Sequence, residues 1–148
     1  MNTDQHIPFM QQALHQAKLA ARDGELPFGA VVVKDNQVIS VGRCREAKRK
    51  TVLAHAEAEA IDKACRTLGT NKLTDCIIYC TNEPCPMCAA AIFQAKVPLV
   101  VIGASRADLS FLRPRAIDIQ ALAEDSGYAI TIVRDILKPH VIELFSQR

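Results

Sequence analysis

The chain has 148 residues, a length typical of one domain and too short for two independent hydrophobic cores. Hydrophobic residues make up 49% of it and charged residues 23%, which excludes a disordered or collagen-like chain. The formal net charge of +2 is too small to indicate, by itself, a partner such as nucleic acid or a membrane surface.

The N-terminal third of the sequence predicts a helix followed by a β-hairpin. Apolar side chains recur at helical spacing over residues 8–23, where Pro8 suits the first turn. Two short runs of β-branched residues, 29–33 and 37–42, predict the strands of the hairpin. The strongly basic segment 43–50 lacks apolar periodicity, so it is predicted to be a solvated loop. Contact of this loop with RNA or phosphate is the alternative.

From residue 54 onward the pattern predicts helices alternating with strands. A helix at 54–68 carries a stripe of alanines that allows close packing on a sheet, and the run 76–81 is apolar on both faces, as a central strand covered on both sides would be. The remaining predicted elements are a helix at 86–96, a strand at 99–103, a helix at 116–125, a strand at 128–133 and a helix at about 136–146. We therefore predict one α/β domain, residues 1–148, with a mixed sheet of about five strands between helical layers.

The N-terminal segment and the apolar runs bear on the cellular compartment, and the compartment bears on the role of the cysteines. No apolar segment with a cleavage site follows the N-terminus, and the longest apolar run, 97–104, is far short of the roughly 20 residues that a membrane helix needs. We therefore expect a cytoplasmic protein without membrane contact. In a reducing cytoplasm, six cysteines favour metal binding or catalysis over disulfides.

Two short motifs carry the candidate chemistry: His55-Ala56-Glu57 at one helix start and Cys85-Pro86-Met87-Cys88 at another. Cysteines at i and i+3 can present both sulfurs to one metal ion, and the positive end of a helix dipole stabilises thiolates. Together with His55 they give three ligands, and a catalytic zinc ion needs a fourth position left open for water. Glu57 is the predicted acid and base beside that water.

The spacing of these motifs makes a geometric prediction. Residues two apart on an ideal helix differ by about 200° in direction, so His55 and Glu57 cannot share one lateral face of the helix. Both can approach a metal that lies beyond the N-terminal end of the helix. We therefore expect the metal between the N-termini of two helices. Because two thiolates cancel the charge of Zn²⁺ and weaken its effect on water, a general base such as Glu57 is required.

The segments LAHAEAEAI (53–61) and TNEPCPMCAAAI (81–92) resemble the cytidine-deaminase superfamily of zinc-dependent nucleobase deaminases, with its H-x-E and P-C-x-x-C signature. The resemblance is strongest to the bacterial guanine-deaminase and tRNA-adenosine-deaminase branch. It implies a three-layer α/β/α cytidine-deaminase-like fold and a homodimer. It also implies one zinc ion per chain, held by His55, Cys85 and Cys88, with Glu57 as the proton shuttle.

Departures from the family pattern bear on the substrate. Where related deaminases carry a base-reading Asn after the second hairpin strand, counting back from His55 gives Cys44. The segment 103–112 also lacks the basic, glycine-containing turn of the tRNA-editing members. Phe28, Cys44 and Ala56 are the residues predicted to contact the base. We expect a small heterocyclic base, a free purine of the guanine type or a related ring, as the substrate, and do not favour nucleic acid.

Other interpretations are open from the sequence alone. Within the same chemistry, the substrate could be adenosine in tRNA, or cytosine or cytidine. In other functional classes, the Cys pair could be a redox site, or zinc could hold together a binding module without activity. A closed structural zinc site needs a fourth protein ligand, for which Cys76 and Cys80 are the candidates.

Overall fold

The computed structural model describes residues 3–110 and 112–147. The strands are β1 (Gly29–Lys34), β2 (Gln37–Arg43), β3 (Ile77–Asn82), β4 (Leu99–Ala104) and β5 (Thr131–Val133). The helices are α1 (Ile7–Arg22), α2 (Glu46–Arg49), α3 (Ala56–Leu68), α4 (Pro86–Gln94), α5 (Ile119–Asp125) and α6 (Lys138–Ser146), with short 3₁₀ turns at Thr3–Gln5 and Arg106–Asp108. None of the helices in this part of the chain is long and apolar enough to cross a membrane.

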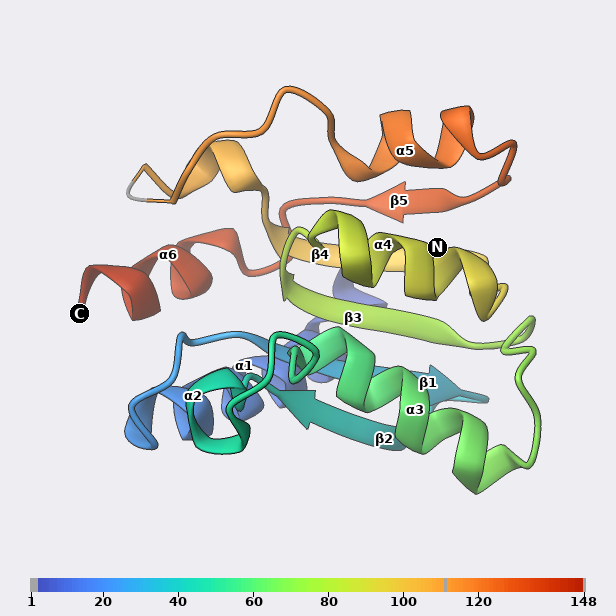
Figure 1. Ribbon diagram of the computed structural model, residues 1–148, viewed down its shortest axis with the longest axis horizontal. Helices are drawn as coiled ribbons and strands as arrows, with labels where there is room; N and C mark the ends of the chain where they lie inside the picture. Colours follow the sequence, from blue (N-terminus) through green and yellow to red (C-terminus); the bar gives the residue numbers. More distant parts are fainter. Residues whose placement is uncertain (1–2, 111, 148) are drawn as a thin grey trace.

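The described strands form one mixed sheet in the order β2-β1-β3-β4-β5 (Figure 1). Strand β1 is antiparallel to both β2 and β3, whereas β3, β4 and β5 are parallel. The predicted α/β fold with about five strands is therefore confirmed, with element ends shifted by a few residues. The largest shifts are at the starts of α5 and β5, which begin three residues later than predicted. Helix α5 begins at Ile119 because the Asp118 side chain caps it by accepting a hydrogen bond from the backbone N–H of Ala121 at 2.9 Å.

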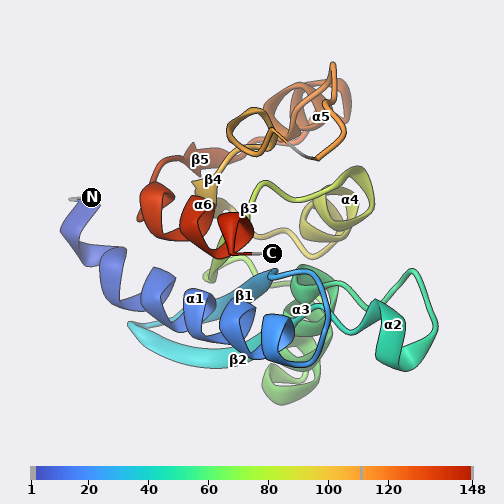
Figure 2. The same ribbon diagram turned by 90° about the vertical axis from the view of Figure 1, so that its left-hand side faces the viewer.

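Helices cover both faces of the sheet. Helices α1 and α6 lie on one side, and α3, α4 and α5 lie on the other (Figure 2). Alternate strand residues divide accordingly: Val31, Tyr79 and Val101 pack on the α1 side, and Val32 and Ile78 pack on the α3 side. This is the three-layer α/β/α arrangement that the family resemblance implies.

The alanine stripe of α3 brings its N-terminus close to β2. Ala56, Ala60 and Ala64 are fully buried against the sheet. A Cβ on Gly42 of β2 would lie 2.1 Å from the carbonyl oxygen of Ala56, so only glycine permits this approach. The position of His55, immediately before α3, is thereby set by contact between two backbones.

The segment 43–50 differs from its prediction. Residues 47–50 are exposed to solvent as predicted, but the segment contains the one-turn helix α2. The Glu25 carboxylate caps this helix by accepting hydrogen bonds from the backbone N–H groups of Ala47 and Lys48 at 3.0 and 2.9 Å. The carboxylate that supplies this cap is 22 and 23 residues away in the sequence from its two partners, so the local sequence pattern cannot reveal it. The three arginines of the segment also form ion pairs: Arg43 with Asp23, and Arg45 and Arg49 with Glu59.

Candidate active site

The N-termini of two helices bring the candidate metal ligands together. His55 is the residue before α3, and Cys85 is the residue before α4, whose first position is Pro86. His55 Nδ1 lies 3.5 Å from the Sγ atoms of both Cys85 and Cys88. The three ligand atoms all lie within 4.8 Å of one another, between the helix ends, as the motif spacing predicts.

The donor set fits a zinc ion with an open coordination position. Two thiolates and one imidazole are typical zinc ligands, and three protein ligands leave a fourth position for water. Among the described residues no fourth His, Cys, Asp or Glu joins this group. Cys76 and Cys80, the candidates for a closed site, are instead buried in the hydrophobic core. The arrangement therefore matches a catalytic metal site better than a structural one.

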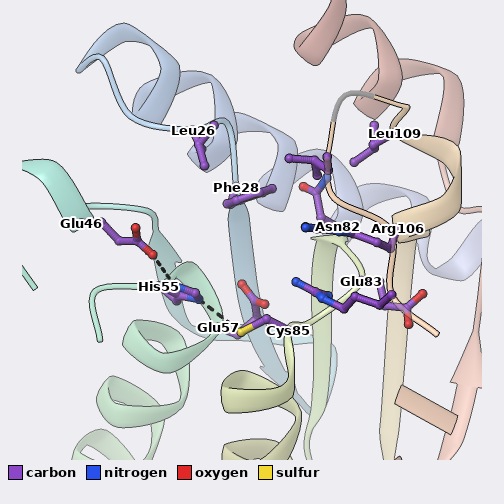
Figure 3. A pocket seen from close by; sticks show the side chains of 12 residues that line it. Leu26, Phe28, Glu46, His55, Glu57, Asn82, Glu83, Cys85, Arg106 and Leu109 are labelled. Carbon is purple, nitrogen blue, oxygen red and sulfur yellow. Dashed lines mark hydrogen bonds and ion pairs between the residues drawn. The ribbon is translucent and has the colours of Figure 1, made fainter. Parts of the chain in front are cut away.

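The opposite edge of the His55 ring contacts Glu46 of α2. The Glu46 carboxylate forms an ion pair with Nε2 of His55, while Nδ1 faces the thiols (Figure 3). A carboxylate on the outer nitrogen fixes the ring orientation and leaves Nδ1 as the ligand atom. The role of Glu46 cannot be read from the sequence, because this residue lies in the segment predicted to be a solvated loop and only the fold of α2 places it beside His55.

The ligand side chains polarise one another in the metal-free protein. A hydrogen bond from the Cys88 thiol, together with the nearby His55 ring, lowers the pKa of Cys85 to about 3. The same hydrogen bond and burial raise the pKa of Cys88. The Cys85 thiolate raises the pKa of His55 to about 9. Because a metal ion needs neutral imidazole and two thiolates, binding must displace protons from His55 and Cys88.

Glu57 lies in the first turn of α3, beside the ligand cluster. Glu57 is only 7% exposed, and no cation among the described residues forms an ion pair with it. Burial, and then the nearby Cys85 thiolate, raise the pKa of Glu57 to about 7. A carboxyl group with a pKa near neutrality can accept and return a proton at physiological pH, which is what a general acid and base requires.

Two other buried glutamates near the site are already engaged. Glu59 receives hydrogen bonds from Arg45 at 2.9 Å and from Lys63 at 3.1 Å. Glu83 accepts hydrogen bonds from Arg134 at 2.8 Å and from the backbone N–H of Ile119 at 3.1 Å. Because these carboxylates hold structural partners, Glu57 is the carboxyl group best placed for proton transfer.

A pocket of about 220 Å³ opens at the ligand cluster, at the end of β3. Its walls come from the segment that precedes β1, from α2, from the two helix N-termini and from the segment after β4 (Figure 3). The pocket is smaller than the roughly 300–1,000 Å³ typical of sites for drug-sized ligands, so its size suits a single heterocyclic base. It is lined by Leu26, Phe28, Glu46, His55, Glu57, Asn82, Glu83, Cys85, Arg106, Leu109, Leu112 and Arg115.

The structure places only one of the three predicted base-contacting residues on this pocket wall. Phe28 lines it, with the ring of Phe145 behind at 5.5 Å between centroids. Cys44 lies outside the lining, buried with its Sγ 3.9 Å from a carboxylate oxygen of Glu25. Ala56 is fully buried where α3 packs on β2. Direct contact of Cys44 or Ala56 with a base therefore finds no support in this geometry.

Arginines, which the sequence analysis did not single out, stand at the other side of the pocket. Arg106 and Arg115 both line it, and Arg106 donates a hydrogen bond to the backbone carbonyl of Arg113. Burial and the neighbouring guanidinium groups of Arg115 and Arg113 lower the pKa of Arg106. No ion pair joins these three arginines to a carboxylate among the described residues. The segment 103–112, predicted to lack a basic turn, thus contributes a cation to the pocket; residue 111 lies outside the described residues.

Comparison with known proteins agrees with this geometry. Residues 3–104 match the model of the cytidine and deoxycytidylate deaminase zinc-binding region. The chain belongs to this deaminase family. Its fold and its zinc-binding cluster of His55, Cys85 and Cys88 are those that the family resemblance implies.

Individual relatives of this chain carry different substrates in their names. The chain is 43% identical to the tRNA-specific adenosine deaminase of Bacillus subtilis over 97 residues, 65% of this chain and 60% of that protein. It is 46% identical to the guanine deaminase of the same organism over 82 residues, 55% of this chain and 53% of that protein. The matched region thus spans between half and two thirds of these relatives.

A solved structure from a study of A-to-I editing by tRNA:A34 deaminases superposes with a TM-score of 0.80. It is 31% identical in sequence, and the match covers 92% of this chain and 97% of that one. The structural similarity therefore extends beyond the zinc-binding region to nearly the whole fold. Evidence on the substrate must come from the residues that line the pocket.

Proposed function

We propose that the protein is a zinc-dependent aminohydrolase that converts an exocyclic amine on a heterocyclic base to a carbonyl and releases ammonia. The observation that carries this proposal is one small pocket in which Glu57, with a pKa of about 7, adjoins the His55, Cys85 and Cys88 ligand atoms. A zinc ion held by these three residues would supply an activated water as the nucleophile.

The chain's own residues then have defined tasks. Glu57 takes one proton from the attacking water and delivers it to a ring nitrogen. It then takes the second proton from the newly added hydroxyl group and gives it to the leaving amine, as the C=O bond forms and the C–N bond breaks. The overall change replaces the C–NH₂ bond of an amidine carbon with C=O, consumes one water and yields one ammonia. Phe28 stacks on the base and holds the amine-bearing carbon near Glu57.

Our first candidate substrate is a free purine of the guanine type or a closely related ring. The small volume of the pocket, about 220 Å³, supports this choice because it suits a free base better than a larger ligand. The pairing of Arg43, Arg45 and Arg49 with acidic side chains also supports it, since these cations are less available to a phosphate backbone.

The second candidate is adenosine within a tRNA, and one observation favours it. Arg106 and Arg115 line the pocket without carboxylate partners among the described residues, and unpaired guanidinium groups bind phosphate well. The two candidates differ in salt dependence, because each phosphate contact steepens the loss of affinity with added salt.

An ammonia-release screen of the zinc-loaded protein separates these candidates. The substrates are free purines, pyrimidines, pterins and triazines, the matching nucleosides and a tRNA anticodon stem-loop, each tested at two salt concentrations. We expect turnover of a free aminopurine that is insensitive to salt. Turnover of the stem-loop alone, with strong salt dependence, would establish the second candidate instead.

The metal assignment has its own measurement. Replacing Cys88 with Ala removes one of three ligands, so we expect loss of the single zinc ion per chain and a lower melting temperature, because metal-binding energy is also folding energy. Elemental analysis of both proteins checks this. Retention of stoichiometric zinc by Cys88→Ala would contradict the assigned ligand set. A homodimer, expected from the family resemblance, remains a prediction for light scattering to check.

A further inference from the structure

Asn82 supplies the pocket with a buried amide that the proposed reaction does not yet use. It is the last residue of β3, at the edge of the sheet where the pocket opens, and it lines the pocket with Phe28 and Glu57. The residue is only 7% exposed. In Figure 3 its side chain stands between Phe28 and Arg106, across the pocket from His55.

Neighbouring hydrogen bonds fix which end of the amide is free. The backbone N–H of Gly29 donates to Thr81 Oγ1 at 3.1 Å, and the Thr81 hydroxyl donates to Asn82 Oδ1 at 2.7 Å. If the amide were reversed, the Thr81 hydroxyl would accept two N–H groups and its own proton would lose its acceptor. The chain of donors therefore leaves Nδ2 as the free end.

The Nδ2 group of Asn82 is buried and has no hydrogen-bond partner among the described residues. Leaving a buried donor unsatisfied is costly, and native proteins rarely do so without a reason. Here the unsatisfied donor is on the wall of the very pocket in which the base is proposed to react. An acceptor atom of a substrate bound in this pocket would satisfy it.

We infer that Asn82 is a specificity-determining residue whose Nδ2 donates a hydrogen bond to an acceptor on the edge of the base, a ring nitrogen or a carbonyl oxygen. This inference rests on the proposed deaminase function and deepens it. It also answers how the base is read in a chain that carries Cys44 at the position of the family's base-reading Asn. An amide is still provided, but by the end of β3 and with its orientation fixed by Thr81.

The test compares guanine with analogues that each lack one acceptor: 7-deazaguanine, 3-deazaguanine and 2-aminopurine. Because 3-deazaguanine also lacks the reacting amidine, it is compared by its dissociation constant alone. In the wild-type zinc-loaded protein, one analogue leaves Nδ2 unsatisfied, so we expect its kcat/KM to fall roughly 5- to 150-fold below that of guanine. In Asn82→Leu the donor is absent, so this discrimination collapses to within about threefold while zinc content stays at one per chain. Unchanged discrimination in Asn82→Leu would overturn the inference.

Two additions keep the inference separable from folding and from the proposed function. Asn82→Asp keeps the shape but replaces the donor with an acceptor, so guanine is disfavoured by at least as much as in Asn82→Leu. The same ratios are measured as dissociation constants in a Glu57→Gln background, which does not depend on turnover. If the Glu57→Gln protein discriminates among the rings through Asn82 but the wild-type protein releases no ammonia, the proposed function alone is refuted. If the Glu57→Gln protein with Asn82 intact binds all four rings equally, the role of Asn82 is refuted.

Discussion

Two glutamates at the start of α3, Glu57 and Glu59, have the same side chain, similar burial and opposite electrostatics. Glu57 faces the pocket, and burial without an ion-pair partner raises its pKa to about 7. Glu59 faces α2. Burial alone would raise its pKa too, but hydrogen bonds from Arg45 and Lys63 outweigh that effect and hold the pKa below its usual range.

The difference shows that the partners of a carboxyl group, rather than its burial, decide its role. Glu59 ties α2 to α3 through cations, and α2 in turn holds Glu46 against His55. Glu57, with no such partners, keeps a proton affinity suited to transfer. The Glu59 carboxylate stabilises the wall of the site, and the Glu57 carboxyl group is available for proton transfer.

The largest effect on this comparison is expected when each of the two glutamates is replaced, in separate variants, with glutamine. Glu57→Gln keeps the ligand set, so we expect one zinc ion per chain with kcat reduced about 10²- to 10⁴-fold, the usual loss when general acid–base help is removed. Glu59→Gln is the matched control and should keep most of the activity. Steady-state ammonia release and elemental analysis measure both. Near-normal turnover by Glu57→Gln would end its assignment as the proton shuttle.

The pH dependence of stability sharpens the contrast in the metal-free protein. Because the pKa of Glu57 is raised from 4.5 to about 7 in the folded state, its contribution to the free energy of unfolding is fully present below pH 4.5. That contribution is lost as the pH rises through 7. Relative to Glu57→Gln, the wild type should therefore lose about 3 kcal/mol of unfolding free energy between pH 4.5 and pH 8. Denaturant unfolding at several pH values measures this difference. A difference that does not vary with pH would show that burial leaves the Glu57 proton unaffected.

Glu59 should show the reverse trend with a smaller amplitude. Its lowered pKa gives stability that is present above pH 4.5 and is lost as the pH falls through the pKa of the folded state. We expect Glu59→Gln to cost about 1–2 kcal/mol at pH 7, because Lys63 and Arg49 are half exposed and solvent screens them. The cost should shrink below pH 4.5 in the same unfolding experiments; a cost that persisted there would indicate lost packing instead of lost charge.

The ligand cluster could be predicted from the sequence because its residues sit at helix starts that local signals reveal. Pro86 marks the start of α4, and the 55–57 and 85–88 spacings restrict where a shared metal can lie. The remaining wall could not be predicted in this way. Glu46 reaches His55 only because Glu25 caps α2, and Arg115 reaches the pocket through an irregular segment without periodicity. Asn82 stands within the TNEPC motif, but only the network through Thr81 shows that its amide has a free end.

The contact between Phe28 and Phe145 links the pocket to the far end of the chain. Phe28 is half-buried because α6 stands behind it, so the aromatic surface offered to a base is only as rigid as the docking of that last helix. Limited proteolysis within α6 would leave the ligand cluster intact and yet loosen the stacking wall. Catalytic competence and substrate affinity can therefore be lost separately, the first through the ligand cluster in the middle of the chain and the second through its last helix.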